Sequence, residues 1–248
     1  MKEIFQNQRA YFKWRVERVK RIEKRFPELF NVKGKKVLDV GCGAEAPLSY
    51  YLSEKKAKVW GGEISKEFVK TAKKFAPNAN ISLFFAEALP FKDETFDIVY
   101  LWDILEHVKN PFKAVKEAKR VCKKGGLIFI EFSPYWAYPT GHHLYMLGFP
   151  RGFLPFQWLP LSWTKKIVLN SKLIIKDKPA SLFRQFQLLN KLSVNKFKKI
   201  IEAQKLKKLR EFYFISLPHR EVKINFISKI PLFKELLTMS YSALFKKQ

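Results

Sequence analysis

A glycine-rich turn and an acidic residue about twenty positions later have the spacing of a nucleotide-binding site. Residues 37–40 are a short, mostly apolar run that suits a strand buried in a parallel sheet, and the run stops at Gly41-Cys42-Gly43. Glycines there let the backbone turn sharply and let a ligand approach it closely. Apolar residues at helical spacing over 48–52 predict a following helix whose free N–H groups face that ligand. Glu63 ends a second apolar stretch, where its carboxylate can accept both hydroxyls of a ribose.

His142 and His143 are adjacent histidines in a stretch that reads as a loop. A histidine with a pKa near neutrality suits the removal of a proton from a hydroxyl acceptor. A loop histidine that hydrogen-bonds the backbone is an equally good interpretation. Tyr135 and Glu131 are the alternatives for a base or an acceptor-orienting group. A metal site with two histidines needs carboxylates nearby, and residues 133–163 offer almost none, so the sequence predicts no metal.

Further motifs follow the glycine turn in a fixed order. They are Val59-Trp60-Gly61-Gly62-Glu63, Phe84-Phe85-Ala86-Glu87-Ala88-Leu89-Pro90-Phe91, Phe96-Asp97-Ile98-Val99-Tyr100, Asp103-Ile104-Leu105-Glu106-His107-Val108 and Arg120-Val121-Cys122-Lys123-Lys124-Gly125-Gly126-Leu127-Ile128-Phe129-Ile130. The ordered series resembles the class I S-adenosylmethionine-dependent methyltransferases, in particular the small-molecule methyltransferase domains, over about residues 30–132. The resemblance implies an α/β fold with a Rossmann-like, doubly wound sheet of seven strands. Such a sheet is mostly parallel with one antiparallel edge strand, and the implied cofactor is S-adenosyl-L-methionine.

The resemblance also implies which residues contact the cofactor. The predicted cofactor-binding residues are Asp39, Gly41, Cys42, Gly43, Glu63, Ile64, Ala86, Glu87 and Trp102. Asp39 is expected to organise the contact to the methionine end, and it can also bond the N–H groups of the turn. Ala46 stands where glycine-rich relatives have a third glycine, and Phe85 stands where many have an Asp or Asn for the adenine amino group. Adenine is therefore expected to be held by the Ala86 N–H, by stacking or by Glu87.

The residues after the fourth predicted strand have both structural and functional interpretations. Asp103-Ile104-Leu105-Glu106 fits a capping box at the start of a helix, and we favour capping over catalysis for both acids. His107 is expected to be a packed or surface histidine. Trp102, at the carboxyl end of the strand, is expected to line the ligand cleft, because ligands bind outside the strand ends of open α/β sheets.

A single methyltransferase domain is expected over residues 1–248, in four consecutive parts. They are an N-terminal helix at 1–30, the cofactor-binding core at 31–132, a lid or substrate insertion at 133–187, and a C-terminal helix and strands at 188–248 that complete the sheet. The insertion is rich in aromatic residues and enters directly from the fifth strand. We therefore expect it to wall the acceptor pocket.

The chain is strongly basic, with 48 Lys and Arg against 22 Asp and Glu and a formal net charge of +26. The excess is densest in residues 133–248, which hold 21 basic and 5 acidic side chains. Such a charge attracts nucleic acid, an anionic membrane surface, or a phosphorylated or lipid-linked substrate, although a Lys-rich proteome explains it equally well. No apolar run is long enough for a membrane helix and the first residues lack a secretory signal, so a cytoplasmic protein is expected, with peripheral membrane contact as an alternative.

Three functional hypotheses follow. The first is transfer of a methyl group from S-adenosylmethionine to an oxygen of a small-molecule, glycan or lipid-linked acceptor, driven mainly by proximity and alignment. The second, an RNA or other nucleic-acid methyltransferase, is favoured by charge alone. The Asn/Asp-Pro-Pro-Tyr motif typical of base-amino methylation is absent after the fourth strand, where Leu101-Trp102-Asp103-Ile104 stands, which favours the first. The third is a non-catalytic binding protein that retains the fold. The sequence leaves the acceptor and the oligomeric state open.

Overall fold

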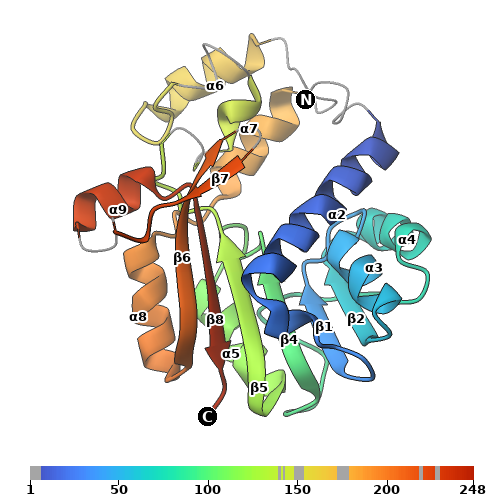
Figure 1. Ribbon diagram of the computed structural model, residues 1–248. Helices are drawn as coiled ribbons and strands as arrows, with labels where there is room; N and C mark the ends of the chain where they lie inside the picture. The colour runs from blue at the N-terminus through green and yellow to red at the C-terminus, as the bar shows by residue number, and fades with distance from the viewer. Residues whose placement is uncertain are drawn as a thin grey trace.

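An eight-stranded sheet runs through the described part of the molecule, in the order β3-β2-β1-β4-β5-β8-β6-β7 (Figure 1). The computed structural model describes residues 7–138, 141, 143–147, 154–171, 179–217, 220–226 and 230–248. Successive strands are placed outward from β1 in both directions, so the sheet is doubly wound. This confirms the expected Rossmann-like α/β class.

Five neighbouring strands form the parallel half of the sheet. They are β1 (Lys36–Val40), β2 (Lys58–Glu63), β3 (Asn80–Leu83), β4 (Phe96–Trp102) and β5 (Cys122–Phe132). β1 and β4 are buried almost throughout, as strands are when both faces of a sheet are covered. Because these strands are parallel, their carboxyl ends lie at one edge of the sheet. That edge is the expected place for a ligand.

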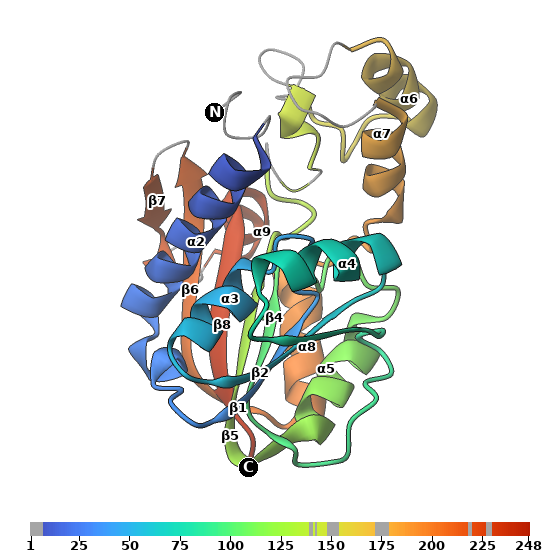
Figure 2. The same cartoon turned by 90° about the vertical axis from the view of Figure 1, so that its right-hand side faces the viewer.

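Helices cover both faces of this half (Figures 1 and 2). One face carries α2 (Gln8–Arg25), η1 (Pro27–Phe30) and α3 (Pro47–Glu54). The other carries α5 (Pro111–Val121) and α8 (Val194–Gln204), while α4 (Lys66–Phe75) packs against β2 and β3. Ile22 of α2 and Leu48 of α3 share a buried cluster with Tyr100, whereas Val115 of α5 and Phe197 of α8 belong to a second cluster. The N-terminal helix expected within residues 1–30 is confirmed as α2.

The C-terminal part differs from the seven-strand expectation. It comprises β6 (Lys207–Leu217), β7 (Arg220–Lys223), α9 (Pro231–Leu237) and β8 (Ser240–Lys246). β8 lies inside the sheet, antiparallel to both β5 and β6, and its residues 240–245 are all buried. β7 pairs antiparallel with β6 and forms the edge. The expected antiparallel edge strand is confirmed. The expected number of seven strands is wrong for the described residues, which form eight. The additional strand, β7, has the sequence Arg-Glu-Val-Lys and is too short and polar to show a strand pattern.

The segment after β5 forms a small unit with its own apolar core. Its described elements are η2 (Leu144–Leu147), α6 (Leu161–Leu169) and α7 (Pro179–Leu188). Tyr135, Phe156 and Phe183 belong to one buried cluster, so this segment covers much of its own aromatic surface. Trp158 and Trp163 stay 52% and 63% exposed. Figure 2 shows α6 and α7 beyond the sheet edge at which the parallel strands end. Whether the segment acts as a lid stays a prediction.

The residues between β4 and α5 do not form the predicted capped helix. α5 begins at Pro111, and the side chain of Asn110 caps it by accepting a hydrogen bond from the N–H of Lys113. Residues 103–110 form turns, so the capping-box prediction for Asp103 and Glu106 is wrong. Both carboxylates instead bond to distant parts of the chain. Within the described ranges, no helix combines the length and apolar character that crossing a bilayer requires.

Candidate active site

The glycine turn after β1 has the backbone geometry that its sequence predicts. Gly41 and Gly43 have φ values of +73° and +77°, which favour glycine. The N–H groups of Gly41 and Cys42 donate to the carbonyl of Gly62 at 2.9 and 3.0 Å, which ties the turn to the end of β2. A Cβ on Gly41 would lie 2.3 Å from Cδ1 of Ile104. The turn between β1 and α3 is therefore closely packed against the loop that follows β4.

Glu63 lies directly beside this turn. Its Oε1 accepts a hydrogen bond from the N–H of Gly43 at 2.9 Å, and its Oε2 accepts one from the N–H of Ile64 at 3.0 Å. Burial raises the pKa of the Glu63 carboxyl, while these two hydrogen bonds oppose the shift. The acid and the glycine turn are thus joined at the carboxyl ends of β1 and β2. This is the juxtaposition that the sequence spacing predicts.

Asp39 is buried in β1, one residue before the end of the strand. Its Oδ2 accepts a hydrogen bond from the hydroxyl of Ser49 in α3 at 2.7 Å. Burial raises the pKa of Asp39 to about 6, and the nearby charge of Glu63 adds to the shift. The thiol of Cys42 is also buried, and its pKa lies well above the ordinary value for the same reason. Asp39 therefore anchors α3 behind the turn as well as lying near the candidate ligand position.

The segment that is predicted to bind adenine already makes hydrogen bonds within the protein through Glu87. Glu87 accepts hydrogen bonds from the N–H groups of Lys109 and Asn110 at 2.9 and 3.2 Å, so its carboxylate holds the start of α5. Ala86 is buried, whereas the side chain of Phe85 is 57% exposed. Ile64, which follows β2, is 65% exposed. Ile64 and Phe85, which follow the ends of β2 and β3, thus present exposed apolar side chains.

Trp102 lies under α2. Its indole N–H donates to Oε1 of Glu131 at 3.0 Å, and the guanidinium of Arg15 lies 4.4 Å from its ring centre. Arg15 and Arg18 bond Oδ2 of Asp103 at 3.2 and 2.9 Å. Arg18 also lies 3.5 Å from Glu131, a buried acid of β5. The N-terminal helix therefore closes over the ends of β4 and β5 through charged contacts that local sequence patterns do not reveal.

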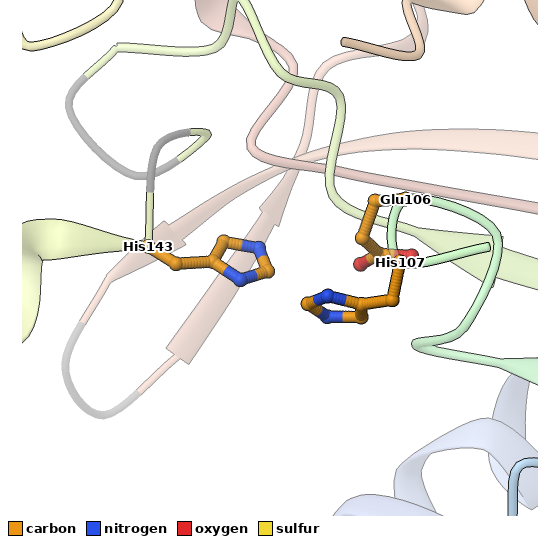
Figure 3. A group of neighbouring side chains, drawn as sticks. All are labelled: Glu106, His107 and His143. Carbon is orange, nitrogen blue, oxygen red and sulfur yellow. The ribbon is translucent and has the colours of Figure 1, made fainter. Parts of the chain in front are cut away.

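A second group of ionisable side chains lies beyond the ends of β4 and β5. It consists of Glu106 and His107, from the loop after β4, and His143, from the segment after β5 (Figure 3). One ligand-capable atom of each residue lies within 4.8 Å of those of the other two. The two imidazole rings meet edge to face, with centres 5.1 Å apart. His107 was expected to be an ordinary packed or surface histidine, so the sequence missed this grouping.

The environments of these three side chains differ. Glu106 is 3% exposed, and its Oε1 accepts a hydrogen bond from the N–H of Ser133 at 3.1 Å. Its Oε2 is buried with no hydrogen-bond partner among the described residues. Burial, with the nearby charge of Asp103, raises the pKa of Glu106 well above its ordinary value. Burial also lowers the pKa of His143 to about 4, so its imidazole is neutral at physiological pH.

Asn190 was not among the predicted site residues, yet it holds the loop that carries this group. Its side-chain amide donates to the carbonyls of Leu105 and Val108 at 2.6 and 2.7 Å, and its backbone N–H donates to the carbonyl of Glu106 at 3.0 Å. These contacts join residues more than 80 positions apart. No local motif could have indicated them.

The remaining predicted catalytic residues are His142 and Tyr135, with Glu131 as an alternative to them. His142 lies outside the described residues, so its role stays a prediction. Tyr135 is 4% exposed and packs in the apolar cluster of the segment after β5. Burial raises the pKa of its phenol, which keeps the hydroxyl protonated and disfavours Tyr135 as a base. Glu131 is engaged by Trp102 and by arginines of α2.

Comparisons with known proteins agree with this architecture. A family model described as a methyltransferase domain matches residues 38–130. An uncharacterized protein of Methanocaldococcus jannaschii is 47% identical over 70 residues, which is 28% of this chain and 33% of that protein. The match to this relative thus spans about a third of its length. A ubiquinone biosynthesis O-methyltransferase of Pseudomonas fluorescens is 29% identical over 185 residues, covering 68% of this chain and 78% of that protein.

Solved structures show the same fold. A structure described as an S-adenosylmethionine-dependent methyltransferase from Methanosarcina mazei aligns with a TM-score of 0.57 at 16% identity, covering 90% of this chain and 96% of that one. The family match extends from β1 to β5 and so includes the glycine turn, Glu63 and the loop after β4. Residues 38–130 therefore match a methyltransferase domain, and the fold is that of solved S-adenosylmethionine-dependent methyltransferases.

Proposed function

We propose that this chain transfers the methyl group of S-adenosylmethionine to an oxygen atom of a small-molecule acceptor. The hydrogen bond from the N–H of Gly43 to Glu63 carries the proposal, because it joins the two parts of the predicted cofactor site at one sheet edge. The name of the Pseudomonas relative, an O-methyltransferase of ubiquinone biosynthesis, supports oxygen as the accepting atom. A glycan and a lipid-linked molecule remain predicted alternatives for the acceptor.

We assign the cofactor to the ends of β1 and β2. Glu63 receives the ribose hydroxyls, and the backbone of Gly41, Cys42 and Gly43 faces the cofactor without a Cβ at either glycine. Asp39, whose pKa is raised only to about 6, is ionised at neutral pH and attracts the cationic methionine end.

We assign the adenine ring to the apolar residues beside this site. In this assignment it lies against Ile64 and beside Ala86, since both follow the ends of neighbouring strands. Glu87 and Trp102 contribute by positioning, because their polar atoms already bond Asn110 and Glu131. Glu87 fixes the segment that presents Ala86, and Trp102 supports the loop after β4.

Methyl transfer to oxygen requires one displacement and one proton transfer. The acceptor oxygen attacks the methyl carbon, the carbon–sulfur bond breaks with its electrons going to sulfur, and the acceptor hydroxyl proton must leave. Holding the two reactants in line lowers the barrier without covalent help from the protein. His107 and His143 lie on the segments that follow β4 and β5, at the sheet edge of the assigned cofactor site, so we place the acceptor hydroxyl beside them, where it loses its proton. His142 remains a predicted proton acceptor.

A transfer assay tests this proposal. The purified, nucleic-acid-free protein is incubated with methyl-labelled S-adenosylmethionine and a panel of phenols, catechols, hydroxylated lipids, glycans and RNA. We expect label in a methyl ether product of at least one small-molecule acceptor, with formation of the demethylated cofactor. The exposed Lys116→Ala protein is the matched control and should retain activity, whereas Glu63→Ala should lose it. Label in RNA alone would contradict the proposal.

A further inference from the structure

We propose that Glu106, His107 and His143 bind a divalent transition-metal cation of the zinc class. The three residues come from two segments, the loop after β4 and the segment after β5, which meet only in the folded chain. Figure 3 shows the two imidazoles directed toward each other, with the Glu106 side chain beside His107. The sequence predicted no metal because residues 133–163 supply almost no carboxylates. The fold supplies the missing carboxylate from Glu106.

The distances fit a site that closes on a cation. One donor atom from each residue lies within 4.8 Å of the other two. Tetrahedral zinc with bonds of about 2.0–2.1 Å places its ligand atoms roughly 3.4 Å apart. The difference is small enough for rotation of the two imidazoles about their side-chain bonds, without movement of a strand or helix.

A second observation points independently to a missing ligand. The Oε2 atom of Glu106 is buried, while the side chain as a whole is 3% exposed, and no described residue bonds that oxygen. A buried carboxylate oxygen without a partner is costly, and a cation is a strong partner for it. The other oxygen, Oε1, is held by the N–H of Ser133. The carboxylate is therefore fixed in orientation with one oxygen left for a ligand.

The surroundings are those of a supported metal site. Ligating side chains in proteins are oriented by hydrogen bonds from residues behind them. Here Asn190 fixes the loop on both sides of Glu106 through the carbonyls of Leu105 and Val108. His143 has a φ of +59°, a backbone conformation uncommon for histidine, and its ring centre lies 5.1 Å from that of His107.

The donor set selects the class of cation. Two imidazoles and one carboxylate suit zinc and its first-row neighbours better than magnesium or calcium, which prefer oxygen ligands alone. Three protein ligands leave at least one coordination position open. This arrangement differs from a structural zinc site, in which four protein ligands close the coordination shell.

The open coordination position would let the cation bind the acceptor hydroxyl, a role that rests on the proposed function. An acceptor hydroxyl bound there would lose its proton to water more easily, because a bound cation stabilises the oxyanion. The oxyanion would then attack the sulfonium methyl, giving the methylated acceptor and the neutral thioether. The cation is neither oxidised nor reduced, and the cofactor supplies the methyl group.

The test is a direct binding measurement on the full chain. Chelator-treated protein is titrated with zinc chloride by calorimetry, and with cobalt chloride while the visible absorption of the cobalt is recorded. We expect one equivalent to bind and cobalt to show the absorption of a nitrogen- and oxygen-bound ion. His107→Ala, His143→Ala and Glu106→Gln should each weaken binding at least tenfold. His219→Ala removes an imidazole from a different part of the sequence and should bind as the unaltered chain does.

Two results would overturn the metal site. One is the absence of zinc and cobalt binding by the unaltered chain, and the other is binding that none of the three substitutions weakens more than His219→Ala. Circular dichroism of each variant establishes that the chain is folded. Titration of the metal-free protein with S-adenosylmethionine separates the two proposals. Cofactor binding without metal binding removes only the metal site, whereas metal binding without cofactor binding contradicts the proposed function.

Discussion

The backbone N–H of Gly43 donates to Oε1 of Glu63 at 2.9 Å, across 20 residues of sequence. This contact holds the acid in position beside the glycine turn before any ligand binds. The second oxygen of Glu63 is held by the N–H of Ile64 at 3.0 Å. In the proposed site, a ribose would therefore meet a carboxylate whose orientation is already fixed, which would reduce the entropy lost on binding.

Replacing Glu63 should weaken cofactor binding strongly. Glu63→Ala removes both oxygens that would accept the ribose hydroxyls, and it also frees the N–H of Gly43. Charge-assisted hydrogen bonds contribute about 1.5–3 kcal/mol each, so we expect at least a tenfold higher Kd for S-adenosylmethionine by calorimetry. Glu54→Ala is the matched control, since Glu54 is exposed at the end of α3. Equal affinities for the two variants would exclude Glu63 from the site.

Gly41 and Gly43 should respond differently to alanine. Both have positive φ, but a Cβ on Gly41 would lie 2.3 Å from Ile104 Cδ1, whereas a Cβ on Gly43 would have no atom within 4 Å. Left-handed strain costs about 1–2 kcal/mol for either alanine. Gly41→Ala adds a steric clash, so its free energy of unfolding in urea should fall further than that of Gly43→Ala. The double variant Gly41→Ala, Ile104→Ala should recover part of the difference.

The contacts of Asp103 to α2 should contribute measurably to stability. Asp103 pairs with Arg15 and Arg18, with side chains 18–23% exposed, and Asp103→Asn removes the charge that both guanidiniums contact. We expect a loss of about 1–3 kcal/mol in the free energy of unfolding. The exposed pair of Lys20 and Glu17 provides the comparison, and Glu17→Ala should cost less than about 0.5 kcal/mol. Similar losses in the two variants would mean that the Asp103 contacts add nothing.

Asp39 should make stability depend on pH. Its pKa is about 6 in the folded chain, raised first by burial, against about 3.9 in an unfolded chain. Between these values the folded state binds more protons, so the contribution of Asp39 to stability falls as pH rises from about 4 to about 6. The full change is about 3 kcal/mol.

The comparison with Asp39→Asn isolates this effect. The asparagine does not titrate, so the unaltered chain should lose stability relative to the variant as pH rises through that window, measured by urea unfolding at each pH. Below pH 4 the difference between the two proteins should level off, because both states of the unaltered chain are then protonated. A difference independent of pH from 4 to 7 would show that the Asp39 pKa is not raised.

Local sequence signals were sufficient to predict the elements that carry the proposed cofactor site. The glycine turn, the helix after Pro47 and the acid at Glu63 each depend on nearby residues, and the structure joins them as their spacing predicts. α2 likewise lies within the range expected for the N-terminal helix, because helical periodicity is a local property.

Contacts between distant segments could not be predicted in the same way. The register of β4 and β5 pairs Trp102 with Glu131, and this pairing brings the loop after β4 to the segment that carries His143. Asp103 and Glu106 match a capping box by spacing, but Arg18 and Ser133 supply their partners. Such pairings follow from the arrangement of the whole sheet, which short motifs do not encode.

The most direct test of the account is calorimetric titration of the purified, nucleic-acid-free chain with S-adenosylmethionine and its demethylated product. We expect micromolar binding of both ligands, and Gly41→Arg should abolish this binding, since even a Cβ at that position meets Ile104. No detectable binding of either ligand to the folded, unaltered chain would contradict the proposed methyltransferase activity. The fold would then serve a binding protein without methyl transfer.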